Sequence, residues 1–195
     1  MRKSLLSVKR WAILCCCASI VMTLYYVILL LIPSALSLFF YIAMSIPTLI
    51  LMGFFFVSAI DTKDKPTKYI SILSGIGSWG VLLPTALNII WENCERPEHW
   101  YSYEEGHYPV YDFCVNNYML FNYLALIGGI FMALYFFYIL RQSNYTLRTI
   151  CIPAIIACLL LGASSLVGKT LFLLLISIII YLLFVLVFYK LYKKL

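Results

Sequence analysis

Charged residues are scarce in this chain and absent from six long stretches of it. Lys, Arg, Asp and Glu make up 11% of the 195 residues, whereas 64% of the residues are hydrophobic. A water-soluble fold of this composition would expose a very large apolar surface, so the composition indicates an integral membrane protein. The net charge of +6 lies mostly beside the apolar stretches, where anionic lipid attracts it. We therefore expect the lipid bilayer as a partner, and no nucleic acid.

The missing charges define the transmembrane segments. A helix needs roughly 20 apolar residues to cross a hydrocarbon core about 30 Å thick. The alternating pattern of a membrane barrel strand is absent, so we expect helices. We predict an all-α membrane protein with six transmembrane helices in one polytopic domain, residues 1–195, with an outer loop at 92–117. The six uncharged runs are 12–32, 35–60, 69–91, 118–140, 149–167 and 170–189.

The absence of ionisable residues inside these runs also excludes several functions. Buried charges mark proton relays, ion pathways and voltage sensors, so charge-coupled transport is disfavoured. Intramembrane proteolysis and zinc hydrolysis lose support for the same reason. His99 and His107 show no H-E-x-x-H or other metal-ligand spacing. We therefore expect no catalytic residue, no metal and no cofactor, and we rank a lipid-acting enzyme below non-enzymatic functions.

The basic residues predict the orientation. Of the 14 Lys and Arg residues, 12 are cytoplasmic if the amino terminus is cytoplasmic, and only Arg96 and Lys169 are outside. This positive-inside bias predicts cytoplasmic N- and C-termini in a plasma membrane or a bacterial inner membrane. A cleaved signal peptide is the alternative for run 12–32 and would leave five spans. The run is longer than the roughly 7–15 apolar residues of a signal peptide, so we favour a span.

The cysteines fall into two groups in this topology. Cys94 and Cys114 flank the outer loop, where oxidising conditions favour a structural disulfide. Cys15, Cys16 and Cys17 follow a basic amino terminus and are candidates for S-palmitoylation. The alternative for these three is that they serve as small apolar residues in a helix interface. Because the chain has no C-x-x-C pair, we do not expect a disulfide-forming enzyme.

Polar chemistry is concentrated at 91–114, which holds six of the eight acidic residues together with many aromatic ones. Such aromatic residues either lie at the headgroup level or anchor a partner. Acids among them favour a basic protein partner, in the membrane or on its extracytoplasmic side. The candidate partner-binding residues are Trp100, Tyr101, Tyr103, Glu104 and Glu105.

Small residues four positions apart predict close helix packing, as at Gly129 and Ala133 and in the series from Ala154 to Gly162. Pro47, Pro84 and Pro153 fall inside the runs and predict kinks. No motif assigns the chain to a family. We favour a non-enzymatic interaction or assembly module that acts through its outer loop and helix faces. The alternative is a carrier or channel for an uncharged or lipid-like molecule, which would use the kinked helices.

Overall fold

The computed structural model describes residues 2–31, 38–93, 108–142, 145–166 and 171–194. All regular structure in these ranges is helical, which confirms the predicted all-α class. The helices are α1 (Arg2–Leu31), α2 (Leu38–Asp61), α3 (Lys65–Asn93), α5 (Pro109–Gln142), α6 (Tyr145–Ser164) and α7 (Leu171–Lys194).

Four helical segments among the described residues are long and apolar enough to cross a membrane: Val8–Leu31, Lys65–Trp91, Pro109–Arg141 and Leu174–Lys194. Ser45–Asp61 and Arg148–Ser164 are shorter apolar helices. Large apolar side chains cover the outward faces of the bundle, as Val21, Leu24 and Ile28 do on α1. These helices are consistent with a multi-pass integral membrane protein.

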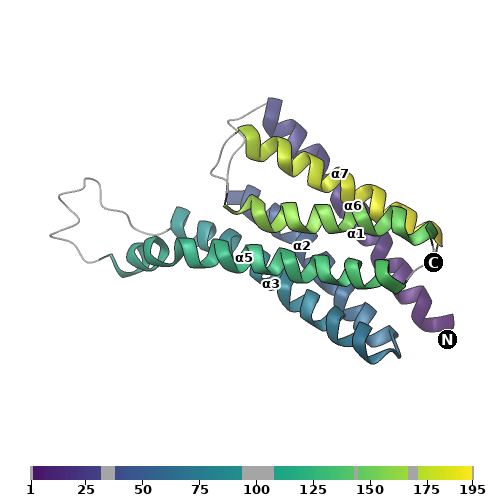
Figure 1. Ribbon diagram of the computed structural model, residues 1–195. Coiled ribbons are helices and arrows are strands. Elements are labelled where there is room, and N and C mark those ends of the chain that lie inside the picture. Colours follow the sequence, from purple (N-terminus) through teal and green to yellow (C-terminus); the bar gives the residue numbers. More distant parts are fainter. Residues whose placement is uncertain (1, 32–37, 94–107, 143–144, 167–170, 195) are drawn as a thin grey trace.

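The helices form a closed ring. Each helix packs against its neighbour in sequence, and α7 packs against α1. In Figure 1, α7, α6 and α5 lie in front of α1, α2 and α3. Both ends of the chain lie at the same end of the bundle. Lys9 on α1 confirms this proximity, because its Nζ lies 4.9 Å from the ring centroid of Tyr192 on α7.

Aromatic side chains fill much of the interior between the two layers. Phe54 and Phe55 of α2 are fully buried. The ring of Phe54 lies edge-on to Phe188 of α7 at 5.2 Å, and that of Phe55 lies edge-on to Tyr135 of α5 at 5.2 Å. Edge-to-face pairs of this kind stabilise a core beyond the area they bury. One aromatic cluster thus joins three helices of the ring.

Glycines bring the backbones of three helices close together. A Cβ on Gly77 of α3 would lie 2.7 Å from the carbonyl oxygen of Gly128 on α5, and a Cβ on Gly129 would lie 2.8 Å from Cα of Gly162 on α6. The seam at Gly129 and Gly162 is one that the sequence predicts. In the α3–α5 seam, Ser74 Oγ donates to the Phe131 carbonyl at 2.8 Å. The glycines of this seam are Gly77 and Gly128, which the four-residue pattern does not identify.

Most helix boundaries differ from the sequence prediction by a few residues, and two differ by more. α1 begins at Arg2 rather than at residue 12, and α3 extends to Asn93. α5 begins at Pro109 rather than at residue 118, so residues 109–117 of the predicted outer loop are helical. The prediction counted apolar residues, and a helix continues into water where local signals support it. Pro109 is such a signal, because proline at the first helical position sacrifices no hydrogen bond.

The start of α3 has a capping residue. Asp64 accepts hydrogen bonds from both the side-chain hydroxyl and the backbone N–H of Thr67, as an N-cap carboxylate does. These two bonds, the side-chain bond first, lower the pKa of the Asp64 carboxyl. The three prolines predicted to kink helices lie inside α2, α3 and α6, whose helical structure continues on both sides of them.

We expect Gly77→Val to destabilise the bundle, because its side chain would meet the backbone of α5, which cannot rotate away. Overpacking of this kind costs about 1–3 kcal/mol. The matched control is Ala86→Val on the same helix, where the side chain is exposed. Thermal unfolding in detergent should show a lower midpoint for Gly77→Val and little change for Ala86→Val. Equal midpoints would show that the seam tolerates a side chain.

Candidate interaction surface

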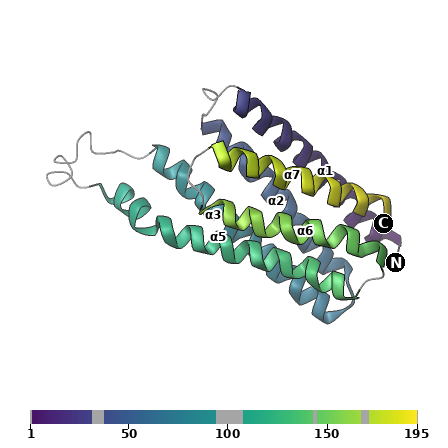
Figure 2. The ribbon, with the colours of Figure 1, turned by 45° about the horizontal axis from the view of Figure 1, so that its top comes forward.

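Two helices extend well beyond the others at the end opposite the termini. α5 has 34 residues and α3 has 29, whereas α6 has 20. At 1.5 Å per residue these helices are about 51, 44 and 30 Å long. Figures 1 and 2 show α3 and α5 reaching past the end of α6. We call the extension of these two helices the projecting hairpin.

The level at which the hairpin leaves the bundle is set by contacts between α5 and the end of α6. Ser165 Oγ, just after α6, donates to the carbonyl of Asn122 on α5 at 3.2 Å. Residues 109–121 of α5 therefore lie beyond α6, a distance of about 20 Å along the helix. This length separates the start of α5 from most of the bundle.

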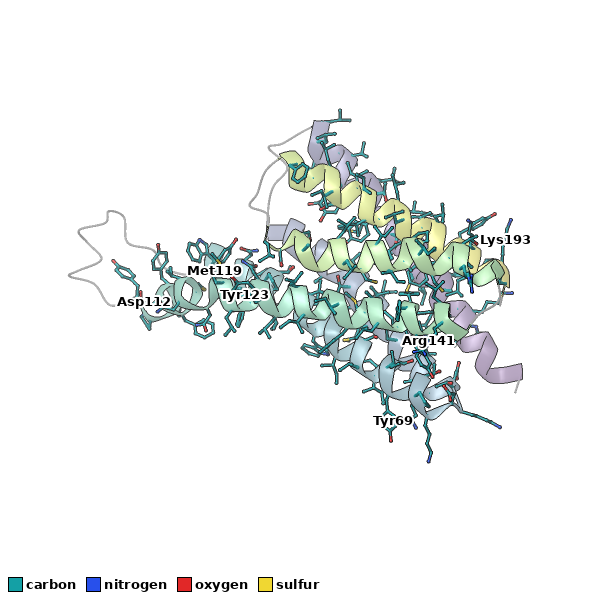
Figure 3. The ribbon with its side chains drawn as sticks, viewed as in Figure 1. Tyr69, Asp112, Met119, Tyr123, Arg141 and Lys193 are labelled. Carbon is teal, nitrogen blue, oxygen red and sulfur yellow. The ribbon has the colours of Figure 1, made fainter. Side chains whose placement is uncertain are left out.

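The projecting part of α5 carries exposed apolar side chains. Phe113 is 48% exposed and Met119 is 62% exposed. Figure 3 shows Met119 and Tyr123 pointing away from the α5 axis, with Asp112 near the start of the helix. We call the following exposed residues the α5 surface: Val110, Phe113, Val115, Tyr118 and Met119. Exposed apolar residues grouped on one segment mark either a protein–protein or a membrane interaction site.

Ring contacts order the projecting hairpin. Trp91 near the end of α3 and Tyr111 near the start of α5 have ring centroids 5.2 Å apart. Within α5, Phe113 and Phe121 meet edge to face at 6.2 Å. The Asn117 side-chain amide donates to the Phe113 carbonyl at 2.8 Å. The α5 surface is therefore preformed on a helix that its neighbour supports.

The predicted partner-binding residues lie outside the described residues. This applies to Trp100, Tyr101, Tyr103, Glu104 and Glu105, and to both histidines. The structure adds Val110, Val115 and Met119, which the sequence reasoning did not single out. The signal that could have found them is Pro109 followed by acidic Asp112 in the first turn, a pattern typical of a helix start.

The three neighbouring cysteines of α1 differ in exposure. Cys15 is buried, with Sγ 3.8 Å from the Ile50 carbonyl, and Cys16 is half-buried, with Sγ 3.8 Å from the Val185 carbonyl. Cys17 is exposed on the outer face of the helix. Packing therefore accounts for Cys15 and in part for Cys16, and Cys17 is the most accessible of the three to an acyl group.

Cys114 is buried on α5, and its predicted disulfide partner, Cys94, lies outside the described residues. Cys114 lies one helical turn from Tyr111, toward the middle of the bundle. Bridged cysteines have Cα atoms about 4.4–6.8 Å apart. The ring of Tyr111 already faces that of Trp91, near the end of α3. A Cys94–Cys114 disulfide therefore requires Cys94 to lie back along α5, next to Cys114. The disulfide stays a prediction.

A small cavity lies among α1, α2, α6 and α7. Its volume is about 10 Å³, which is close to the space of one water molecule. Ser19, Thr48 and Tyr181 give it polar groups, and Ser19 Oγ donates to the Cys15 carbonyl at 2.7 Å. Pro47 also lines the cavity. This cavity does not accommodate an organic substrate in the conformation described.

Among the described residues, no three His, Cys, Asp or Glu side chains are placed to hold a metal ion. Comparisons of the chain with protein families, curated proteins and solved structures found no match. The function of this chain is therefore inferred from its own geometry.

We expect any S-acylation of the cysteine run to be at Cys17, because it is the one cysteine of the three that is exposed. An acyl-exchange assay should detect wild type and Cys16→Ser equally and lose its signal in Cys17→Ser. A signal that persists in Cys17→Ser would show that the packed thiols are modified. No signal in wild type would mean that the cysteines serve packing only.

If Cys94 and Cys114 are bridged, the oxidised protein should run faster than the reduced protein on denaturing gels. Cys114→Ser should abolish this difference and make residues 94–107 more sensitive to protease, while the apolar helices still insert. Cys158→Ser is the matched control, because Cys158 is equally buried but lies on α6. Free alkylation of both Cys94 and Cys114 in untreated denatured protein would exclude the bridge.

Proposed function

We propose that this chain is a six-span membrane protein with cytoplasmic termini that acts as a non-enzymatic interaction module. Its α5 surface, together with the acidic outer segment that precedes it, binds an extracytoplasmic or membrane protein partner. The observation that carries this proposal is the exposed apolar surface on a helix extending about 20 Å beyond α6.

The length of α6 supports placing this surface outside the lipid. At about 30 Å, α6 matches the hydrocarbon thickness, so its two ends approximate the two membrane boundaries. Arg148 near its start belongs to the basic end of the bundle, and Ser165 lies at the level of Asn122. On this placement the residues of α5 before Asn122 lie at or beyond the outer headgroups, so the span of α5 begins about four residues later than the predicted run 118–140. Apolar side chains there gain from covering by protein rather than by lipid tails.

Charge favours a basic partner. Segment 91–114 contains six of the eight acidic residues of the chain and one basic residue, Arg96. Asp112 extends this acidity onto α5. Complementary charge raises the rate of encounter, and the apolar residues contribute most of the affinity once water is displaced. The partner should therefore present lysine or arginine around an apolar or aromatic centre.

The interior supports the interaction module over a carrier or channel. Phe54, Phe55 and Phe188 are buried in contact between the helix layers, where a solute pathway would need space. The cavity beside Pro47 is close to the size of a water molecule. A carrier would have to separate these aromatic contacts during each transport cycle.

We expect a photo-crosslinking amino acid at Met119 to capture one defined partner in native membranes. Adding Phe113→Ser should reduce this capture by at least about tenfold, since loss of a central aromatic anchor typically costs 2 kcal/mol or more. The same crosslinker at Tyr69, an exposed tyrosine at the opposite end, is the matched control.

Three results would contradict the interaction proposal: capture that is equal from Met119 and Tyr69, capture that Phe113→Ser does not change, or a captured partner without a basic surface. Purified protein in liposomes provides an independent comparison. Saturable solute flux that Phe113→Ser leaves unchanged would favour the carrier function.

A further inference from the structure

A concentrated basic surface lies at the other end of the bundle, where α1 and α7 meet. Arg10, Lys190 and Lys193 are exposed there, and Lys9 is half-buried. We call these four residues the α1–α7 basic surface. Val8 and Trp11 of α1, and Leu191 of α7, pack toward the core. The charged side chains are therefore anchored on two helices that hold each other in place.

Two tyrosines organise this surface. Lys9 Nζ lies 4.9 Å from the ring centroid of Tyr192, which joins α1 to α7. Lys193 Nζ lies 4.7 Å from the ring centroid of Tyr189, one helical turn along α7. A cation–π contact restrains an ammonium group while leaving N–H donors for another acceptor. Two ammonium groups at this end are thus each held near a phenol ring of α7.

No acid in α1 or α7 compensates this charge, because neither helix contains Asp or Glu. The other basic cluster at this end differs. Lys63, Lys65 and Lys68 surround the α2–α3 connection, where Asp61 and Asp64 also lie. Figure 3 shows Lys193 and Tyr69, the neighbour of Lys68, at opposite edges of this end. The two clusters therefore contain three lysines each, but the α2–α3 cluster also has acidic residues beside its lysines.

We propose that the α1–α7 basic surface binds the headgroup of an anionic phospholipid in the adjoining leaflet. Lysine ammonium groups bind the phosphate as point charges. A tyrosine at headgroup depth suits this position because its ring is apolar and its hydroxyl is polar. The acyl chains of the same lipid lie along the exposed apolar side chains of the two helices, such as Leu186 on α7 and Leu14 on α1. This site is independent of the proposed partner at the outer end.

The test is retention of phosphatidylglycerol by the purified full chain, measured by native mass spectrometry during titration, with phosphatidylcholine as the neutral reference. The variant carries Lys9→Gln, Lys190→Gln and Lys193→Gln. Each lysine near an anionic surface contributes roughly a fivefold factor, so the triple variant should bind phosphatidylglycerol about a hundredfold more weakly. Lys→Arg at the same three positions should retain binding, since the charge remains.

The matched control replaces Lys63, Lys65 and Lys68 by Gln, which removes the same charge from the same end. This control should keep wild-type retention. Equal weakening in the two triple variants would overturn the site in favour of general attraction. Equal retention of the two lipids by wild type would also overturn it. Soluble glycerophosphoglycerol should not displace the lipid, and displacement at comparable concentration would identify a free phosphate ester as the ligand instead.

Discussion

The close approach of α3 and α5 is the interaction on which the rest of the arrangement depends. Gly77 and Gly128 face each other, and a Cβ on Gly80 would lie 2.6 Å from the carbonyl oxygen of Leu124. In lipid, apolar side chains gain little by leaving the solvent, so helix association relies on backbone proximity and interhelical hydrogen bonds. The Ser74 hydroxyl contributes such a bond to the Phe131 carbonyl. This seam forms the base from which the two helices extend beyond the bundle.

The second constraint is the space between the helix layers. Helices packed around a ring leave a wider gap at the centre than at the contacts between neighbours, and small residues cannot fill it. Phe54, Phe55 and Tyr135 span this gap with edge-to-face contacts. Glycine at the contacts and aromatic rings at the centre are therefore complementary: the first brings neighbouring backbones together, and the second fills the volume that remains.

The sequence predicted the helical class and the approximate position of each helix, because long uncharged runs have few alternatives in a membrane. It predicted the Gly129 and Gly162 seam from their small neighbours. It missed Gly128 as a contact, since adjacent glycines show which region is small but not which face meets a neighbour. It also assigned residues 109–117 to a loop, because it sought uncharged apolar runs and Asp112 interrupts this stretch. The expected spans at 35–60 and 149–167, the orientation and the disulfide stay predictions.

A membrane protein can recognise another molecule in its interior, along its lipid-facing sides or at its ends. In this bundle interior serines bond to backbone carbonyls: Ser19 Oγ donates to Cys15 and Ser58 Oγ to Phe54 on their own helices, and Ser74 Oγ donates to Phe131 on α5. Because these hydroxyl groups are already satisfied, they do not require a ligand.

The lipid-facing sides are almost uniformly apolar and distinguish poorly between lipids and helices. We therefore expect selective recognition at the two ends of the bundle, where water can hydrate charged side chains. One end places Lys9 and Lys193 against tyrosine rings, and the other places Phe113 and Met119 on the part of α5 that extends beyond α6. The second arrangement favours binding because the helix that carries these side chains is held rigidly at the α3–α5 seam. An apolar side chain on a flexible loop loses conformational entropy when it binds, whereas one on a helix clamped at the α3–α5 seam has already been ordered by folding.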